Sequence, residues 1–271
     1  MEEFSRYIGG EALYGEDFTP EEIKQWYADE QEGYANLGAK DSASYQYVYH
    51  AWNRFHAYRH LPDTRFNHVL GFGSAYGDEL LPIISRIRDL TIVDPSSAFV
   101  RSDLHGIPVR YVTPMPDGRL PLPDRTFDLI TCFGVLHHIP NVSFVTAELA
   151  RTLKPGGYIA LREPIISLGD WRRPRPGLTK RERGIPLHLL HKFLEDSGLV
   201  VCRWSLCGFT VLPRVFKLIR PDFYNSGLIA YVDALVSRTF SWNANYHPQS
   251  IFDRIRPTSA FFVARKPNNE V

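Results

Sequence analysis

Cysteine, net charge and long apolar runs are all scarce in this chain of 271 residues. The three cysteines, Cys132, Cys202 and Cys207, form no Cys-x-x-Cys pair, so we expect neither a zinc site nor a disulfide framework. A formal net charge of +1 provides no broad basic field for nucleic acid. These shortages favour an ordinary globular protein of a reducing compartment.

The chain also lacks the features of a membrane or secreted protein. Its longest uncharged run, Leu129–Ala147, contains His137, His138, Pro140 and Asn141 in its middle, which excludes a membrane span there. The sequence starts Met-Glu-Glu-Phe, without the basic start and apolar run of a signal peptide. We therefore expect a soluble, cytoplasmic protein with no membrane span.

From about residue 66, short apolar runs alternate with helical patterns. Strands are predicted at residues 67–73, 90–96, 108–114, 127–134, 158–164, 199–207 and 259–266, and helices at 77–88 and 143–153. Strands that alternate with helices imply a parallel sheet covered on both faces. Ligands of such sheets bind beyond the carboxyl ends of the strands.

Two aromatic-rich regions fall outside this alternation. We expect residues 1–60 to form an N-terminal helical cap and residues 207–256 a helical insert before the last strand. The core then comprises residues 61–206 and 257–271. Both outer regions could be lids over the ligand edge of the sheet, or they could simply be aromatic helices packed on the core.

A glycine-rich turn follows the first predicted strand, in HVLGFGSAYGDEL at residues 68–80. Gly71, Gly73 and Gly77 let the backbone turn tightly, and the bare N–H groups suit the polar part of a nucleoside-bearing ligand. A dinucleotide fingerprint needs glycine where Tyr76 stands, so a pyrophosphate site is disfavoured.

Four more stretches follow this turn in order: TIVDPS at residues 91–96, LPLPDRTFD at 120–128, CFGVLHHIPN at 132–141 and LKPGGYIALREP at 153–164. Together, over roughly residues 66–165, they resemble the class I S-adenosylmethionine-dependent methyltransferases, in particular a small-molecule subfamily with LPxPDxxFD and LHHxxN patterns. The resemblance implies a Rossmann-like α/β fold with a mostly parallel seven-stranded sheet. It also implies S-adenosylmethionine as methyl donor and S-adenosylhomocysteine as product.

The resemblance also predicts which residues bind the cofactor. Asp94 would accept hydrogen bonds from the ribose hydroxyls, Pro95 would face the adenine, and Asp117, one residue out of register, would meet its amino group. Gly71 replaces an acid that holds the methionine end in the family, and Asp78 or Glu79 could compensate. The predicted cofactor positions are Gly71, Phe72, Gly73, Ala75, Gly77, Asp94, Pro95, Asp117, Phe133 and Gly134.

Methyl transfer to a hydroxyl benefits from a base near the acceptor. His137, His138 and Glu163 are the predicted catalytic residues, although a double histidine can also be a packing feature; His188 and His191 are further candidates. No third ligand accompanies the latter pair, so no metal is predicted. The loop at 162–183, with a net charge of +4, either grips an anionic acceptor or is a solvated surface.

The favoured function is O-methylation of a small molecule: a sugar, a nucleotide-linked sugar or a secondary metabolite. One alternative is a methyltransferase fold that binds a ligand or partner without methyl transfer, because Gly71 replaces the family's acid. A nucleic-acid methyltransferase is disfavoured. An enzyme that methylates the amino group of adenine usually has an Asn/Asp-Pro-Pro-aromatic motif where this chain has CFGV. An enzyme that methylates C5 of a pyrimidine needs a nucleophilic cysteine, commonly after proline, whereas Cys132 follows a threonine. The oligomeric state, monomer or homodimer, stays open.

Overall fold

The computed structural model describes residues 2–37, 46–171, 173, 175–216, 222–250 and 252–268. Residues 38–45 of the predicted cap and 217–221 and 251 of the predicted insert lie outside this described part. The strands are β1 (Phe66–Phe72), β2 (Ile87–Val93), β3 (Asp103–Leu104), β4 (Ile107–Val112), β5 (Phe127–Phe133), β6 (Leu153–Pro164), β7 (Val200–Cys207) and β8 (Ser259–Arg265).

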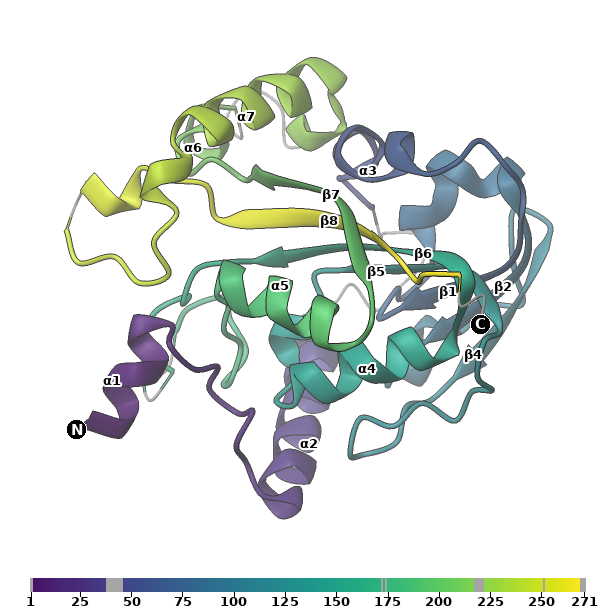
Figure 1. Cartoon of the computed structure of the whole chain (residues 1–271), viewed down its shortest axis with the longest axis horizontal. Helices are drawn as coiled ribbons and strands as arrows, with labels where there is room; N and C mark the ends of the chain where they lie inside the picture. Colours follow the sequence, from purple (N-terminus) through teal and green to yellow (C-terminus); the bar gives the residue numbers. More distant parts are fainter. Residues whose placement is uncertain are drawn as a thin grey trace.

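These strands form one sheet in the order β3-β4-β2-β1-β5-β6-β8-β7 (Figure 1). Strands β4, β2, β1, β5 and β6 run parallel, whereas β8 lies antiparallel between β6 and β7. The predicted mostly parallel sheet is confirmed, but the predicted count of seven strands is wrong by one. The additional strand is β3, which pairs antiparallel with β4 across a tight turn at His105 and Gly106, both with positive φ.

The longer helices are α1 (Glu2–Gly9), α2 (Pro20–Leu37), α3 (His50–His56), α4 (Val142–Thr152), α5 (Leu187–Asp196), α6 (Leu212–Phe216) and α7 (Gly227–Thr239). Short 3-10 helices are η1 (Tyr58–His60), η2 (Asp78–Arg86), η3 (Ser97–Phe99), η4 (Leu136–His138), η5 (Phe223–Asn225), η6 (Ser241–Asn243) and η7 (Phe252–Arg254). The helix predicted after the glycine turn is thus a 3-10 helix. It contains Pro82, which lacks the N–H that an α-helix needs there.

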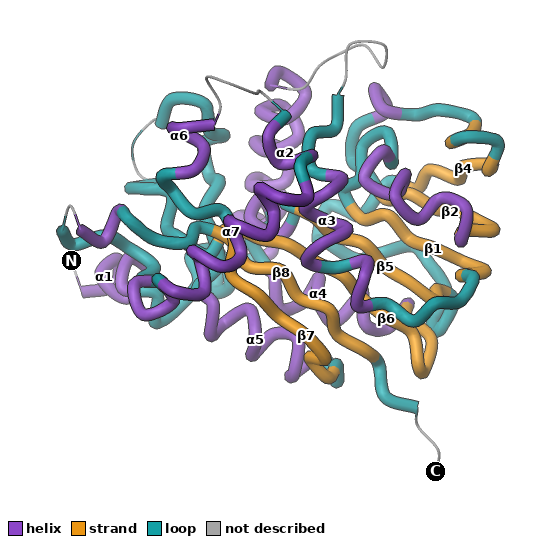
Figure 2. The backbone as a smooth tube through the Cα atoms, turned by 90° about the horizontal axis from the view of Figure 1, so that it is seen from above, coloured by secondary structure: helices purple, strands orange, loops and turns teal. Residues whose placement is uncertain are grey.

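Helices cover both faces of the sheet, as expected for parallel strands (Figure 2). Successive strand residues point to opposite faces, so Leu70 and Ile130 belong to the core under α4 and α5. Their neighbours Val69 and Leu129 belong to the core under α3, η2 and α7. The predicted insert therefore packs mainly through α7 on α3 and β7.

The described part of the chain contains no helix that is long and apolar enough to cross a membrane.

Candidate functional site

The carboxyl ends of β1, β2 and β5 meet at one edge of the sheet. The backbone N–H groups of the next residues continue the hydrogen bonding: Gly73 donates to Val93 O at 2.8 Å, and Asp94 donates to Val112 O at 3.2 Å. On the other side, Gly134 donates to Arg162 O at 2.7 Å. Three predicted site residues from distant parts of the sequence are thus fixed beside one another.

The glycine turn has the left-handed backbone that its sequence suggests. Gly73 has a φ of +63° and Gly77 one of +79°. A Cβ atom on Gly73 would lie only 2.5 Å from Cγ1 of Val135, so the turn leaves no room for a side chain. Ala75 adopts a φ of +46°, which is unusual for alanine. It stands where the resembled family has a glycine, so the turn keeps its shape despite the substitution.

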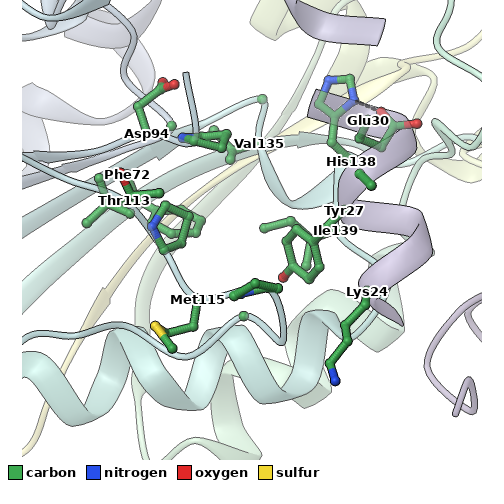
Figure 3. A pocket seen from close by; sticks show the side chains of 18 residues that line it. Lys24, Tyr27, Glu30, Phe72, Asp94, Thr113, Met115, Val135, His138 and Ile139 are labelled. Atoms are coloured by element: carbon green, nitrogen blue, oxygen red, sulfur yellow. Dashed lines mark hydrogen bonds and ion pairs between the residues drawn. The ribbon is translucent and has the colours of Figure 1, made fainter. Parts of the chain in front are cut away.

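A first cavity of about 330 Å³ lies beyond these strand ends (Figure 3). Its core-side walls include Phe72, Gly73, Asp94, Pro95, Thr113, Met115, Gly134, Val135, His138 and Ile139, and α2 contributes Lys24, Tyr27, Ala28 and Glu30. In this view Asp94 and the Glu30–His138 pair lie on opposite sides of the cavity. The predicted cap therefore covers the ligand edge of the sheet, through α2.

Asp94 is a buried acid on the strand side of this cavity, and Glu30 is a second one on α2. Oδ2 of Asp94 accepts a hydrogen bond from Ala75 N at 3.1 Å, and its Oδ1 accepts one from Ser96 N at 2.9 Å. Burial raises the pKa of Asp94 to about 6, although these two N–H groups oppose the shift. Each carboxylate oxygen keeps a further lone pair. The arrangement suits a ligand with two adjacent hydroxyl donors.

A second cavity of about 280 Å³ adjoins the first, and Gly73 and Gly134 line both. Its other walls are residues 46–49, Ser74, Ala75, Glu79, Phe133 and Arg162. Two charged side chains of opposite sign, Glu79 and Arg162, therefore face the same space. The two cavities therefore meet at two glycines. Among the described residues of the predicted insert, none lines either cavity.

Seven of the ten predicted cofactor positions line a cavity: Phe72, Gly73, Ala75, Asp94, Pro95, Phe133 and Gly134. Gly71 and Gly77 belong to the glycine turn but line neither cavity. The structure does not place Asp117 on a wall either, because its Oδ2 pairs with Arg119 Nε at 2.7 Å. Its neighbours Met115, Pro116 and Gly118 line the cavity instead, which fits the one-residue shift seen in the sequence.

Of the three predicted catalytic residues, only His138 lines a cavity, with its Nδ1 2.8 Å from Oε2 of Glu30. Glu163 is fully buried, and its Oε1 accepts backbone hydrogen bonds from Val135 at 2.9 Å and Leu136 at 2.8 Å. Its Oε2 lies 2.8 Å from Nδ1 of His137. These bonds make Glu163 a positioning residue for the η4 turn.

His137 is held between two carboxylates, because its Nε2 also lies 3.5 Å from Oε1 of Glu182. Both ring nitrogens therefore face acids instead of a cavity. His137, His138 and Glu182 bring ligand-type atoms within 4.8 Å of one another, a cluster that the sequence does not predict. The contacts of His137 with Glu163 and Glu182 already account for this arrangement as an ion-pair network.

This network makes stability depend on pH. Burial lowers the pKa of His137, but Glu163 and Glu182 outweigh it and raise the pKa to about 9 from the ordinary 6.5. A raised pKa stabilises the fold fully below pH 6.5, and the contribution is lost as pH rises to 9. Urea unfolding should show a loss on the order of 3 kcal/mol at most across that window. Glu182→Gln should flatten this dependence; parallel pH curves for the two proteins would contradict the assignment.

Two arginines of the basic loop at 162–183 contact the rest of the chain, whereas the side chains of Arg173 and Lys180 are largely exposed. Arg183 is fully buried and donates through Nη2 to the carbonyls of Ile139 at 2.7 Å and Pro140 at 3.1 Å. Arg181 Nε lies 2.8 Å from Oδ2 of Asp29 on α2. The loop thus fastens the cap and the η4 turn to the core. Arg172 lies outside the described residues.

Sequence reasoning missed several wall residues. Arg162 was predicted only as part of the basic loop. Its position near the end of β6, next to Glu163, could have indicated that it lies at the ligand edge of the sheet. Tyr27, Glu30 and residues 46–49 come from the aromatic-rich cap, where no motif marks them. Only packing of the cap on the sheet brings them to the site.

A mostly parallel open sheet with this strand order, a glycine turn after β1 and an acid after β2 is a Rossmann-like arrangement, in which ligands bind beyond the carboxyl ends of the strands. Residues 70–161 match the family model described as "Methyltransferase domain". This stretch of the chain is therefore similar to a methyltransferase domain, in agreement with the predicted resemblance to the class I S-adenosylmethionine-dependent methyltransferases.

Three known proteins illustrate this similarity. A "Probable S-adenosylmethionine-dependent methyltransferase" of Mycobacterium tuberculosis is 26% identical over 193 residues, which are 71% of this chain and 66% of that protein. The chain thus spans just under two thirds of that relative. A "Ubiquinone biosynthesis O-methyltransferase" of Photorhabdus laumondii is 33% identical over 97 residues, 35% of this chain and 40% of that protein. The crystal structure of an S-adenosylmethionine-dependent methyltransferase of Mesorhizobium loti superposes on this chain with a TM-score of 0.51 at 16% sequence identity. The superposition covers 76% of this chain and 93% of that one, so the two share a fold.

Proposed function

We propose that the protein transfers a methyl group from S-adenosylmethionine to a small-molecule acceptor and releases S-adenosylhomocysteine. The observation that carries the proposal is the pair of cavities joined at Gly73 and Gly134, with the Asp94 carboxylate buried in the first. An adenosine fits the first cavity by its chemistry: Asp94 suits the ribose hydroxyls, and Pro95 and Met115 offer apolar surface to a base. Bound there, the cofactor supplies a methyl group on a sulfonium for an in-line displacement.

The segments that cover the site support the proposal of a small acceptor. Helix α2 lines the first cavity and residues 46–49 line the second, so an acceptor has to reach the bound cofactor past this cover, which supports a compact molecule over a nucleic-acid duplex. We propose an oxygen acceptor on a sugar, a nucleotide-linked sugar or a secondary metabolite. The partial match to an enzyme named for O-methylation in ubiquinone biosynthesis supports oxygen. The three free cysteines suit action in the cytoplasm.

His138 is the proposed base for a hydroxyl acceptor. It lines the first cavity, and the contact between its Nδ1 and Glu30 fixes the orientation of the ring. Burial lowers the pKa of His138, and the neighbouring His137 lowers it further, whereas Glu30 opposes both. The imidazole is therefore neutral near pH 7 and able to take a proton. Glu163 and His137 keep the turn that carries it in place.

Replacing Asp94 tests the proposal. Asp94→Asn keeps the shape of the side chain but removes its charge, so S-adenosylhomocysteine binding measured by calorimetry should weaken by about 1–3 kcal/mol. Asp89→Asn, on the exposed end of the same strand, is the matched control and should not change affinity. Unchanged binding by Asp94→Asn would remove the ribose assignment. Tight binding by the unmodified protein without methylation of any acceptor in a broad panel would favour the binding-only alternative.

A further inference from the structure

The volume beside Gly71 is already filled by two polar side chains. Gly71 is the second-last residue of β1 and stands where the resembled family carries an acid. A Cβ atom placed on Gly71 would lie 2.5 Å from Oγ of Ser74 and 3.5 Å from Oε1 of Glu79. A carboxylate that starts on η2 therefore reaches the space that an acidic residue at position 71 would take.

Glu79 is unusual for a buried acid. Glu79 is 4% exposed and lines the second cavity, and its Oε1 has no hydrogen-bond partner among the residues that the structure describes. Burial raises the pKa of Glu79 to about 7, and the nearby Ser74 hydroxyl opposes the shift. A buried carboxylate oxygen without a donor is costly, so a bound cationic donor would relieve a penalty that the folded chain carries.

Arg162 lines the same cavity and, like Glu79, has a buried polar atom without a hydrogen-bond partner among the described residues. Its Nη1 is buried without a hydrogen bond, and in the described part of the chain its side chain joins no ion pair. Aromatic rings hold the guanidinium instead, with Tyr49 at 4.5 Å and Trp52 at 5.2 Å from ring centroid to Cζ. Stacking of this kind leaves the planar edge of an arginine available for a carboxylate.

The two charges act on common neighbours without pairing with each other. Burial raises the pKa of Tyr47, Arg162 opposes that shift, and Glu79 adds to it. Tyr47 lines the same cavity, so both charged groups lie near it. A cavity with one anionic and one cationic wall, each with a buried polar atom that no described residue satisfies, is complementary to a zwitterion such as an α-amino acid.

We propose that Glu79 binds the α-ammonium group and Arg162 the α-carboxylate of the methionine portion of the cofactor. The inference rests on the proposed function, because it assigns the second cavity to the amino-acid end of a ligand whose adenosine occupies the first. Gly73 and Gly134, shared by both cavities, are the passage between the two ends. The acid has thus moved from the end of β1 to the start of η2, and Gly71 provides the room for it.

Calorimetry with two ligands tests the assignment. S-adenosylhomocysteine carries the amino-acid end, whereas 5′-methylthioadenosine lacks it and keeps the adenosine and the sulfur. Glu79→Gln and Arg162→Met should each weaken S-adenosylhomocysteine binding by about tenfold or more, the effect of losing a charged hydrogen bond. Binding of methylthioadenosine should stay unchanged. Asp78→Asn is the matched control, because that neighbouring acid pairs with Arg101 at 2.6 Å, and it should change neither affinity.

The outcomes separate the two proposals. Equal losses of affinity for both ligands would mean that Glu79 and Arg162 act through the glycine turn. Unchanged affinities would mean that they do not bind the ligand. Either result overturns the assignment of Glu79 and Arg162 but leaves the proposed function standing. If the unmodified protein binds neither ligand, the proposed function falls with it. Arg162→Lys keeps a positive charge but loses the planar fork, so its partial loss would support the carboxylate contact should Arg162→Met fail to fold.

Discussion

Gly73→Val is expected to abolish binding of S-adenosylhomocysteine. A Cβ atom at this position would lie 2.5 and 2.6 Å from the two Cγ atoms of Val135, and the φ of +63° disfavours a β-branched residue. The added methyl groups would also enter the passage between the two cavities, which Gly73 lines on both sides. Calorimetric titration of the folded variant, with folding checked by circular dichroism, measures the effect.

Gly106→Val is the control for this variant. Gly106 has a φ of +83°, and no atom lies within 4 Å of the place where its Cβ would be. Backbone strain should cost each variant about 1–2 kcal/mol of unfolding free energy. Gly73→Val should lose more than Gly106→Val because of its contact with Val135, and only Gly73→Val should lose the ligand. Should Gly73→Val be too unstable to study, Gly73→Ala brings the same Cβ against Val135. Normal affinity in a folded position-73 variant would show that the ligand does not cross the glycine turn.

Glu163→Ala is expected to destabilise the protein by about 3–5 kcal/mol, the cost of breaking a buried charge pair. The fully buried carboxylate accepts hydrogen bonds from the backbone N–H groups of Val135, Leu136 and His137. Its removal leaves these donors without an acceptor and takes away the 2.8 Å partner of His137. Urea unfolding at pH 7 gives the change in free energy.

Glu148→Ala is the matched surface control. Glu148 also accepts a backbone hydrogen bond, from Leu120 at 2.9 Å, and pairs with Arg151 at 2.8 Å, but its side chain is 15% exposed and Arg151 is 30% exposed. Water can replace these contacts, so we expect a loss of about 1 kcal/mol. Equal losses from the two substitutions would mean that Glu163 does not organise the turn around His137.

The core strands could be predicted because each is a short apolar run bounded by turn residues. The runs at Val69 and Ile130 lie in the middle of the sheet, where burial on both faces demands such a composition. The two-residue strand β3 could not be predicted, because its pairing depends on the turn at Gly106 rather than on any pattern of its own. The 3-10 geometry of η2 has a visible cause in Pro82.

Most of the predicted cofactor positions lie on cavity walls, whereas the wall residues that the cap contributes were not predicted. Gly73 and Asp94 stand at strand ends, so topology alone brings them together. The roles of His137 and Glu163 are different: their sequence context is the same for a base as for a packed ion pair, and only burial distinguishes the two. Tyr27 and Glu30 reach the cavity from a helix far away in sequence, through packing that no local pattern encodes.

The walls of the two cavities come from separate parts of the chain. Asp94, Gly73 and Gly134 lie within the matched stretch at residues 70–161, whereas α2 and residues 46–49 precede it. Substitutions in α2 or in residues 46–49 leave the residues of the glycine turn and Asp94 unchanged. The two sets of walls can therefore vary independently of each other in evolution.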